Sequence, residues 1–162
     1  MNLIYSGSYA QVVDEYAAID TLPSWFEGVY LNFAENLLYS RTASDESSTQ
    51  GTKGKEDSKI AVTEVREGGT EVRHVSWGKL RAEVGEMASA MKAHGVKKGS
   101  RIAIVSSNSV DTLKVYLAST ALGGIVSTSS TDMGTKGVLD RLLQIEPKVR
   151  RFSLIYTQAN YV

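Results

Sequence analysis

Residues 101–105 read Arg-Ile-Ala-Ile-Val and residues 125–128 read Ile-Val-Ser-Thr, and these two short apolar runs decide the fold. Turn-forming residues bound each run, which is typical of a buried β-strand. The chain between them starts with potential helix caps at 106–109 and then places apolar residues at helical intervals until Gly123-Gly124. Strand, helix and strand in succession predict two parallel strands joined by a right-handed crossover.

The residues before this unit predict a hairpin and a long helix. Residues 60–65 and 72–75 have the composition of strands, and Gly68-Gly69 between them is typical of a tight turn. Ser76 provides an N-cap for a helix over 77–94. The apolar stripe of that helix comprises Trp77, Leu80, Val84, Met87, Ala88 and Met91.

The residues after the unit predict a third helix over 135–145, which Pro147 ends, and one more strand over 152–156. The fold class is therefore α/β. We expect a partial parallel sheet of the Rossmann-like, doubly wound kind, flanked by helices and preceded by an irregular N-terminal extension. The ligand edge of such a sheet lies at the carboxyl ends of its strands.

The N-terminal extension itself predicts two short helices and a loop. Val12, Val13, Tyr16 and Ala17 have the spacing of an amphipathic helix, and residues 31–38 repeat that pattern with Asn32 as an N-cap. Residues 44–55 contain no large apolar side chain, so they cannot bury enough surface to offset the entropy cost of ordering. We expect a flexible, exposed loop there.

Composition narrows the classes of function. The 162 residues carry 18 basic and 18 acidic side chains, so no strong field attracts nucleic acid or an anionic membrane. The chain has no cysteine, which excludes disulfides, thiol nucleophiles and thiolate metal sites. The N-terminus lacks the pattern of a secretory signal, and no apolar run reaches the roughly 20 residues that span a bilayer. These features predict a soluble intracellular protein.

Two strand-to-helix turns have the chemistry of ligand sites. The stretch 127–137 is rich in Ser, Thr and Gly and includes Lys136, so it could hold phosphate at a helix N-terminus. The turn 106–109 offers further hydroxyls but lacks the glycine pattern of a dinucleotide site. The alternative for both turns is ordinary helix capping.

Histidines and aromatic residues are the remaining candidates. His74 and His94 have no supporting carboxylate cluster, so we expect structural or surface roles rather than a metal site or a catalytic triad. The pair Trp25-Phe26, close to Gly28, either lines a ligand site or anchors an extended segment to a core.

Three stretches, taken in order, form a familiar pattern. Residues 25–38 read Trp-Phe-Glu-Gly-Val-Tyr-Leu-Asn-Phe-Ala-Glu-Asn-Leu-Leu. Ser-Trp-Gly-Lys-Leu begins at Ser76 and leads to Gly-Ser-Arg-Ile-Ala-Ile at Gly99, while 123–142 runs from Gly-Gly-Ile-Val to Leu-Asp-Arg-Leu. In this order the stretches resemble the acetyl- and acetoacetyl-CoA synthetases, which are adenylate-forming (AMP-binding) acyl-CoA synthetases. The stretch Asn-Phe-Ala-Glu-Asn at residues 32–36 favours the acetoacetyl branch.

The resemblance implies a function for the complete enzyme. Members of the family use ATP and magnesium to convert a carboxylic acid into an acyl-adenylate, release pyrophosphate and pass the acyl group to CoA. For the acetoacetyl branch the acid is acetoacetate and the compartment is the cytoplasm. By resemblance, Ser130, Thr131 and Asp132 lie near the CoA nucleotide, although the related enzymes have glycines where Thr131 and Asp132 stand.

The family's ATP phosphate loop, its nucleotide contacts and its catalytic lysine have no counterpart in these residues. We therefore expect an N-terminal fragment of such a ligase that is inactive alone and has no catalytic or metal-binding residue of its own. Apolar surface left exposed would favour self-association. The alternative is a small non-catalytic module that binds CoA or a nucleotide, or a pure interaction domain.

The resemblance also suggests a division of the chain. Residues 1–41 form the N-terminal synthetase-like segment, and 42–59 the flexible polar loop. Residues 60–148 form part of the AMP-binding domain. Residues 149–162 form a divergent tail that does not align with the family, as an altered reading frame, a retained intron or a truncated gene would produce.

Overall fold

The computed structural model describes residues 3–18, 20–42, 49–66 and 68–147. The chain divides into two compact units, residues 1–55 and residues 56–162. The expected strand at 152–156 and the divergent tail from 149 onward lie outside the described residues.

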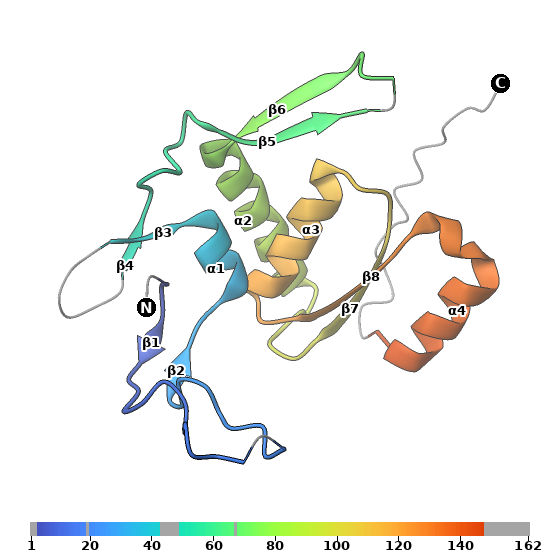
Figure 1. Cartoon of the computed structure of the whole chain (residues 1–162). Helices are drawn as coiled ribbons and strands as arrows, with labels where there is room; N and C mark the ends of the chain where they lie inside the picture. The colour runs from blue at the N-terminus through green and yellow to red at the C-terminus, as the bar shows by residue number, and fades with distance from the viewer. Residues whose placement is uncertain (1–2, 19, 43–48, 67, 148–162) are drawn as a thin grey trace. The chain divides into compact units, whose positions relative to one another are not determined.

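The first unit consists of short elements (Figure 1). Strand β1 (Ser6–Gly7) pairs antiparallel with β2 (Val29–Tyr30), and β3 (Ser40–Thr42) pairs antiparallel with β4 (Thr49–Gly51). Helix α1 (Phe33–Leu38) lies between β2 and β3 in the chain. Asn32 caps it, because its side-chain oxygen accepts a hydrogen bond from the Glu35 amide at 3.1 Å.

Helix α1 also ties the rest of this unit together. The Asn36 side chain accepts from the Ile4 amide at 2.8 Å and donates to the Ile4 carbonyl at 2.9 Å, so it pairs with the chain as a strand would. The Lys55 ammonium donates to the carbonyls of Asn36, Leu37 and Tyr39 at 2.7 to 3.0 Å. A cation there satisfies the last carbonyls of the helix and its negative end.

Two expectations for the first unit need revision. The predicted helix at Val12–Ala17 is wrong, since the chain forms a turn in which the Tyr16 amide donates to the Asp14 carboxylate at 3.0 Å. Tyr16 is 98% exposed, so the expected apolar face has nothing to pack against, and burial of such a face supplies most helical stability. The polar stretch expected as a loop contains strand β4, while residues 43–48 lie outside the described residues.

The second unit contains the regular elements. Strands β5 (Ile60–Val65) and β6 (Val72–Ser76) form an antiparallel hairpin, followed by α2 (Trp77–Ala93). Strand β7 (Arg101–Val105), α3 (Val110–Ala121) and β8 (Ile125–Ser129) complete the expected strand–helix–strand unit. A 3₁₀ turn, η1 (Thr131–Met133), leads into α4 (Gly134–Ile145).

The core of this unit lies between the helices and the parallel strands. Helix α2 packs on α3, α3 contacts β7 and β8, and α4 contacts β7 (Figure 1). Side chains of β6, α2, β7 and α3 are almost fully buried, namely Val75, Leu80, Val84, Ile102, Leu117 and Ala118. Close approach at the start of β8 requires glycine, because a Cβ on Gly124 would lie 2.5 Å from Ile102 Cδ1 and 2.9 Å from the Ser119 carbonyl oxygen.

The predictions of single elements in this unit are confirmed. The predicted partial parallel sheet is confirmed only in outline. The hairpin, the three helices and the parallel pair all form close to the expected residues. Among the described residues the strands form separate two-stranded sheets, three of them antiparallel and one parallel. The class is mixed α/β with small sheets.

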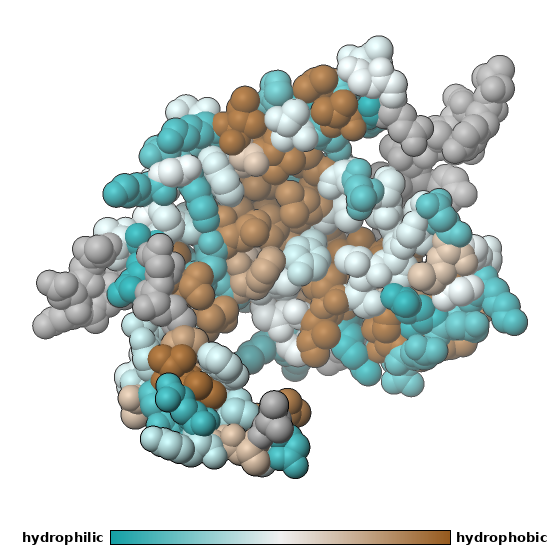
Figure 2. Space-filling view, viewed as in Figure 1, coloured by the Kyte–Doolittle hydropathy of each residue, from teal (hydrophilic) through white to brown (hydrophobic). Residues whose placement is uncertain are grey.

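Exposed apolar side chains remain on the second unit. Figure 2 shows brown patches at the hairpin and around α4. The exposed residues there include Ile60, Val65, Val72, Leu139 and Leu143, and α4 has no buried residue at all. Burial of apolar area is the main favourable term in folding and association, so these faces are unfavourable in water.

Candidate functional site

The parallel strands bring two polar turns to one edge of the sheet. Strands β7 and β8 pair in register from Arg101↔Ile125 to Val105↔Ser129, so they end side by side. The amide of Ser106, the first residue after β7, donates to the carbonyl of Ser129, the last residue of β8, at 3.4 Å. The carboxyl ends of parallel strands are where α/β sheets place ligands.

Hydroxyl groups at the turn after β7 are engaged in hydrogen bonds within the turn. Ser109 caps α3, since its hydroxyl accepts from the Thr112 amide at 3.2 Å. The Thr112 hydroxyl lies 2.8 Å from that of Ser106 and donates to the Ser107 carbonyl at 2.8 Å. Ser109 thus acts as a cap and the other two hydroxyls bond within the turn, which agrees with the structural alternative stated for this turn.

A carboxylate from the hairpin also occupies the N-terminus of α3. Glu64 Oε1 of β5 accepts from the Val110 amide at 2.9 Å, and Arg73 of β6 lies 3.7 Å from the other Glu64 oxygen. A negative group at a helix N-terminus is favourable, and it repels any further anion. The turn after β7 is therefore closed to phosphate.

The first turn of α3 carries a second acid within an ion-pair cluster. Lys114 Nζ lies 2.5 Å from Asp111 Oδ1 and 3.2 Å from Glu83 Oε2 of α2. The hydrogen bond from Lys114 holds the pKa of the Asp111 carboxyl below its ordinary value, although burial acts in the opposite direction. Burial alone would lower the pKa of Lys114, but the hydrogen bonds and charges of both acids outweigh it and raise that pKa.

The turn after β8 is different. Ser130, Thr131 and Asp132 are exposed, and the Ser130 hydroxyl accepts from the Asp132 amide and lies 3.2 Å from the Asp132 carboxylate. Helix α4 follows with no side-chain cap hydrogen bond at Met133 and no acid in its first turn, where Lys136 is exposed. The uncapped amides and Lys136 supply positive charge at the start of α4, and the Asp132 carboxylate opposes it.

The histidine and aromatic candidates belong to neither turn. His74 Nδ1 lies 3.0 Å from the Thr63 hydroxyl across the hairpin, and His94 Nδ1 lies 2.8 Å from the Ala90 carbonyl at the end of α2. Trp25 is 66% exposed, while Phe26 packs edge-on against Tyr9 with ring centroids 5.1 Å apart. Phe26 is therefore a local packing residue, and the two histidines serve the hairpin and the helix end.

Two residues that shape this edge escaped the sequence analysis. Glu64 and Lys114 are polar, and their importance depends on contacts across 46 and 31 positions of the chain, to Val110 and Glu83. A signal was present for Glu64, because alternation along β5 places it on the same strand face as Val62. A carboxylate on a partly buried face needs a donor.

Groups that could hold a metal are absent from the part of the chain that the structure describes: no three His, Asp or Glu side chains gather there. No helix within the same residues is long and apolar enough to cross a membrane.

Comparison with known proteins decides the family. The family described as AMP-binding enzyme matches residues 50–151, which is more than half of the chain. The chain belongs to the AMP-binding enzyme family. The matched range begins in β4 and includes the hairpin, the parallel pair and both turns of its carboxyl edge.

Within this family the chain is similar to acetoacetyl-CoA synthetases. It is 39% identical to that of Xenopus tropicalis over 147 residues, which cover 91% of this chain and 20% of the relative. It is also 39% identical to the malonamoyl-CoA synthetase of Penicillium aethiopicum over 145 residues, 90% of this chain and 19% of the relative. The chain thus spans about a fifth of the length of these relatives.

Part of a solved structure has the same fold as this chain. The acetoacetyl-CoA synthetase from Streptomyces lividans aligns with 90% of this chain and 20% of its own, at a TM-score of 0.72 and 29% identity. The described elements therefore correspond to part of the acyl-CoA synthetase fold, and the resemblance seen in the sequence is confirmed.

Proposed function

We propose that this chain is the N-terminal part of an acid–thiol ligase of the acetoacetyl-CoA synthetase kind. In the complete enzyme, acetoacetate, ATP and CoA give acetoacetyl-CoA, AMP and pyrophosphate, with magnesium as the metal. The observation that carries this proposal is the 39% identity to an acetoacetyl-CoA synthetase over nine-tenths of the chain. A cytoplasmic location belongs to the same proposal.

The fold of the complete domain is the second part of the proposal. Strands β7 and β8 would be neighbours in a larger parallel, doubly wound sheet of the Rossmann-like kind, to which further chain adds strands. The exposed apolar residues of β8 and α4, such as Ile125 and Leu143, support this because added strands and helices would cover them. We expect the isolated chain to self-associate through such faces.

The third part concerns CoA. We place its nucleotide beside Ser130, Thr131 and Asp132, in the turn after β8. The hydroxyls of Ser130 and Thr131, the uncapped amides at the start of α4 and the charge of Lys136 suit an anionic group. The Asp132 carboxylate opposes such a group, so it would reduce affinity rather than create it.

A chimeric enzyme tests the proposal. Residues 8–147 of this chain would replace the matching segment of the acetoacetyl-CoA synthetase of Xenopus tropicalis, and pyrophosphate release would be measured with and without acetoacetate. We expect acetoacetate-dependent release from the chimera and none from the isolated chain, which has no counterpart of the family's ATP phosphate loop. A matched chimera with Gly124→Val, which disrupts the strand pair, serves as the inactive control.

Two outcomes would overturn the proposal. A folded chimera without acetoacetate-dependent activity would show that the segment does not serve such a ligase. Stoichiometric binding of CoA by the isolated chain, together with an inactive chimera, would favour a non-catalytic binding module.

A further inference from the structure

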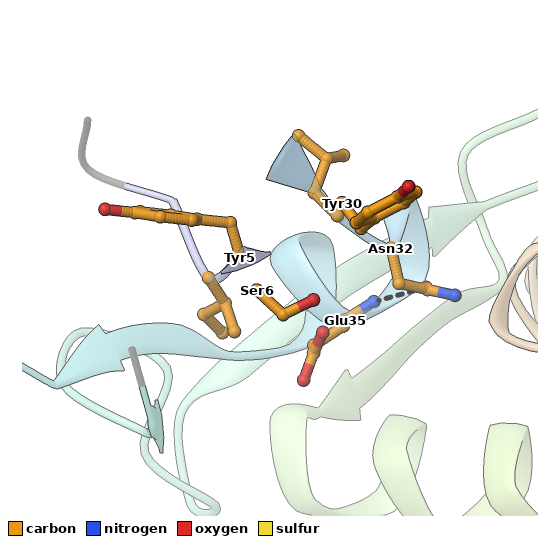
Figure 3. Close-up of a pocket in the computed structure, with 7 residues that line it drawn as sticks. Tyr5, Ser6, Tyr30, Asn32 and Glu35 are labelled. Atoms are coloured by element: carbon orange, nitrogen blue, oxygen red, sulfur yellow. Dashed lines mark hydrogen bonds between the residues drawn. The ribbon is translucent and has the colours of Figure 1, made fainter. Parts of the chain in front are cut away.

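The first unit contains a pocket of its own. It has a volume of about 360 Å³ and is formed by β1, β2 and the start of α1 (Figure 3). Its lining combines the rings of Tyr5 and Tyr30 with the polar side chains of Ser6, Asn32 and Glu35. This size and this mixture of aromatic and polar groups are typical of sites for small molecules.

The walls of the pocket are held in place before any ligand arrives. Ser6 and Tyr30 are paired residues of the β1–β2 ladder, so the two sides of the pocket are joined directly. The lining residue Ile4 is 4% exposed and is fixed by two hydrogen bonds with the Asn36 side chain. A preformed site costs little conformational entropy when a ligand binds.

Glu35 gives the pocket its charge. It is the ionisable carboxylate among the lining residues, and Gln50 orients it by donating to Oε1 at 2.7 Å. No cation of the described chain forms an ion pair with Glu35. Its charge is therefore available to a ligand, and a carboxylate favours a cationic group.

The tyrosines favour the same kind of ligand. The Arg41 guanidinium carbon lies 5.5 Å from the Tyr5 ring centroid, so that ring already holds a cation of the chain and Tyr30 is the ring left for a ligand. Tyr30 is 69% exposed, so its ring is accessible from outside. A ring of this kind attracts an ammonium group through its face and an apolar body through its area.

We propose that this pocket binds a small organic cation, in which a primary ammonium pairs with Glu35 and an apolar or aromatic body lies against Tyr30. Its lining residues all belong to the first unit and include none of the residues proposed for CoA.

A charge-matched series of probes tests this with the full chain. Phenethylammonium, 2-phenylethanol and phenylacetate have similar bodies but carry a positive charge, no charge and a negative charge. Amide chemical shifts of the ¹⁵N-labelled protein would be followed during titration. We expect the cation to shift the amides of Ser6, Leu31 and Glu35 and to bind about fivefold more tightly than the neutral probe, as one partly exposed ion pair allows.

A pair of variants then isolates the carboxylate. Glu35→Gln retains the shape and the acceptor for Gln50, and it should remove the preference for the cation. Glu27→Gln makes the same change at an exposed residue outside the pocket, and it should leave the preference intact. Equal affinities for the three probes, or equal effects of the two variants, would overturn the proposal. The probe comparison uses the unaltered chain, so it tests the proposal even if one variant folds poorly.

Discussion

The two turns at the carboxyl edge of the parallel pair share a hydroxyl-rich composition but differ in how the following helix is capped. Both are rich in hydroxyl groups, and both join a strand to a helix. The turn after β7 is closed, because Ser109 caps α3 and Glu64 accepts from the Val110 amide. The turn after β8 is open, because α4 begins with no side-chain cap and with Lys136 in its first turn.

The comparison shows that composition alone does not identify an anion site. The turns differ in whether an amide at the start of the following helix already has an acceptor. At the start of α3 a carboxylate of the hairpin, remote in sequence from that helix, provides one. In the closed turn the positive end of the helix is already neutralised. In the open turn it remains available to a ligand.

The largest expected effect comes from breaking the strand pair that carries both turns. A Cβ at residue 124 meets the Ser119 carbonyl at 2.9 Å as well as Ile102, so Gly124→Ala should destabilise the protein by about 1–3 kcal/mol. Urea denaturation measures this. The matched control is Gly85→Ala on an open face of α2, which should be stabilising by roughly 0.5–1 kcal/mol. Equal effects of the two changes would contradict the packing at β8.

A smaller effect is expected from opening the closed turn. Glu64→Ala leaves the amide of Val110, a residue only 2% exposed, without its acceptor, which should cost about 1–2 kcal/mol. Hydrogen exchange at Val110 should accelerate together with the loss of stability. Glu71→Ala, which removes a hairpin glutamate whose side chain is 71% exposed, should change the stability by less than about 0.5 kcal/mol. Unchanged protection of the Val110 amide would refute the cap.

The ion-pair cluster of the closed turn should give a pH-dependent effect. Lys114→Met removes the ammonium and retains most of the packing of the aliphatic stem, so it should cost about 1 kcal/mol or less near neutral pH. Lys79→Met, which removes a lysine 3.9 Å from Glu83, should cost about 0.3 kcal/mol.

The direction of the pH dependence of stability follows from the pKa shifts of Asp111 and Lys114. The pKa of Asp111 is lowered on folding, so its contribution is present above about pH 3.9, the ordinary pKa of an aspartate, and is lost as the pH falls through the folded value. The pKa of Lys114 is raised, so its contribution is present below about pH 10.4 and is lost as the pH rises through the folded value. Urea melts from pH 3 to 11 should show the difference between the wild type and Lys114→Met narrowing at both ends. A constant difference would contradict the pairing.

Elements with local sequence signals could be predicted, and contacts between distant residues could not. Ser76 and Ser109 identify the starts of α2 and α3 because a cap acts within its own helix. The failed helix at Val12–Ala17 had the right spacing but lacked a surface to bury its apolar face. The roles of Lys55 and Glu64 depend on carbonyls and amides that only the fold brings within reach.

In the candidate site, too, the residues could be selected from the sequence, whereas contacts with distant residues could not be predicted. Ser130, Thr131 and Asp132 were selected by resemblance, and the structure describes them as exposed residues that lead into an uncapped helix. Whether CoA lies beside them stays a prediction. That the neighbouring turn at 106–109 is closed could not be read from its own residues, because the closing group belongs to β5.

The most direct measurement is the KM for CoA of the chimeric synthetase with charge changes in the two turns. Lys136→Gln should raise this KM and Asp132→Asn should lower it, each by roughly twofold to fivefold, because each alters one exposed charge beside an anion. Asn108→Asp, a charge change in the closed turn, should leave it unaltered, and all three variants should retain the KM for acetoacetate. We predict that the KM for CoA shifts in opposite directions in Lys136→Gln and Asp132→Asn and does not shift in Asn108→Asp. A KM for CoA that does not respond to Lys136 or Asp132, or that responds equally to Asn108→Asp, would contradict the account.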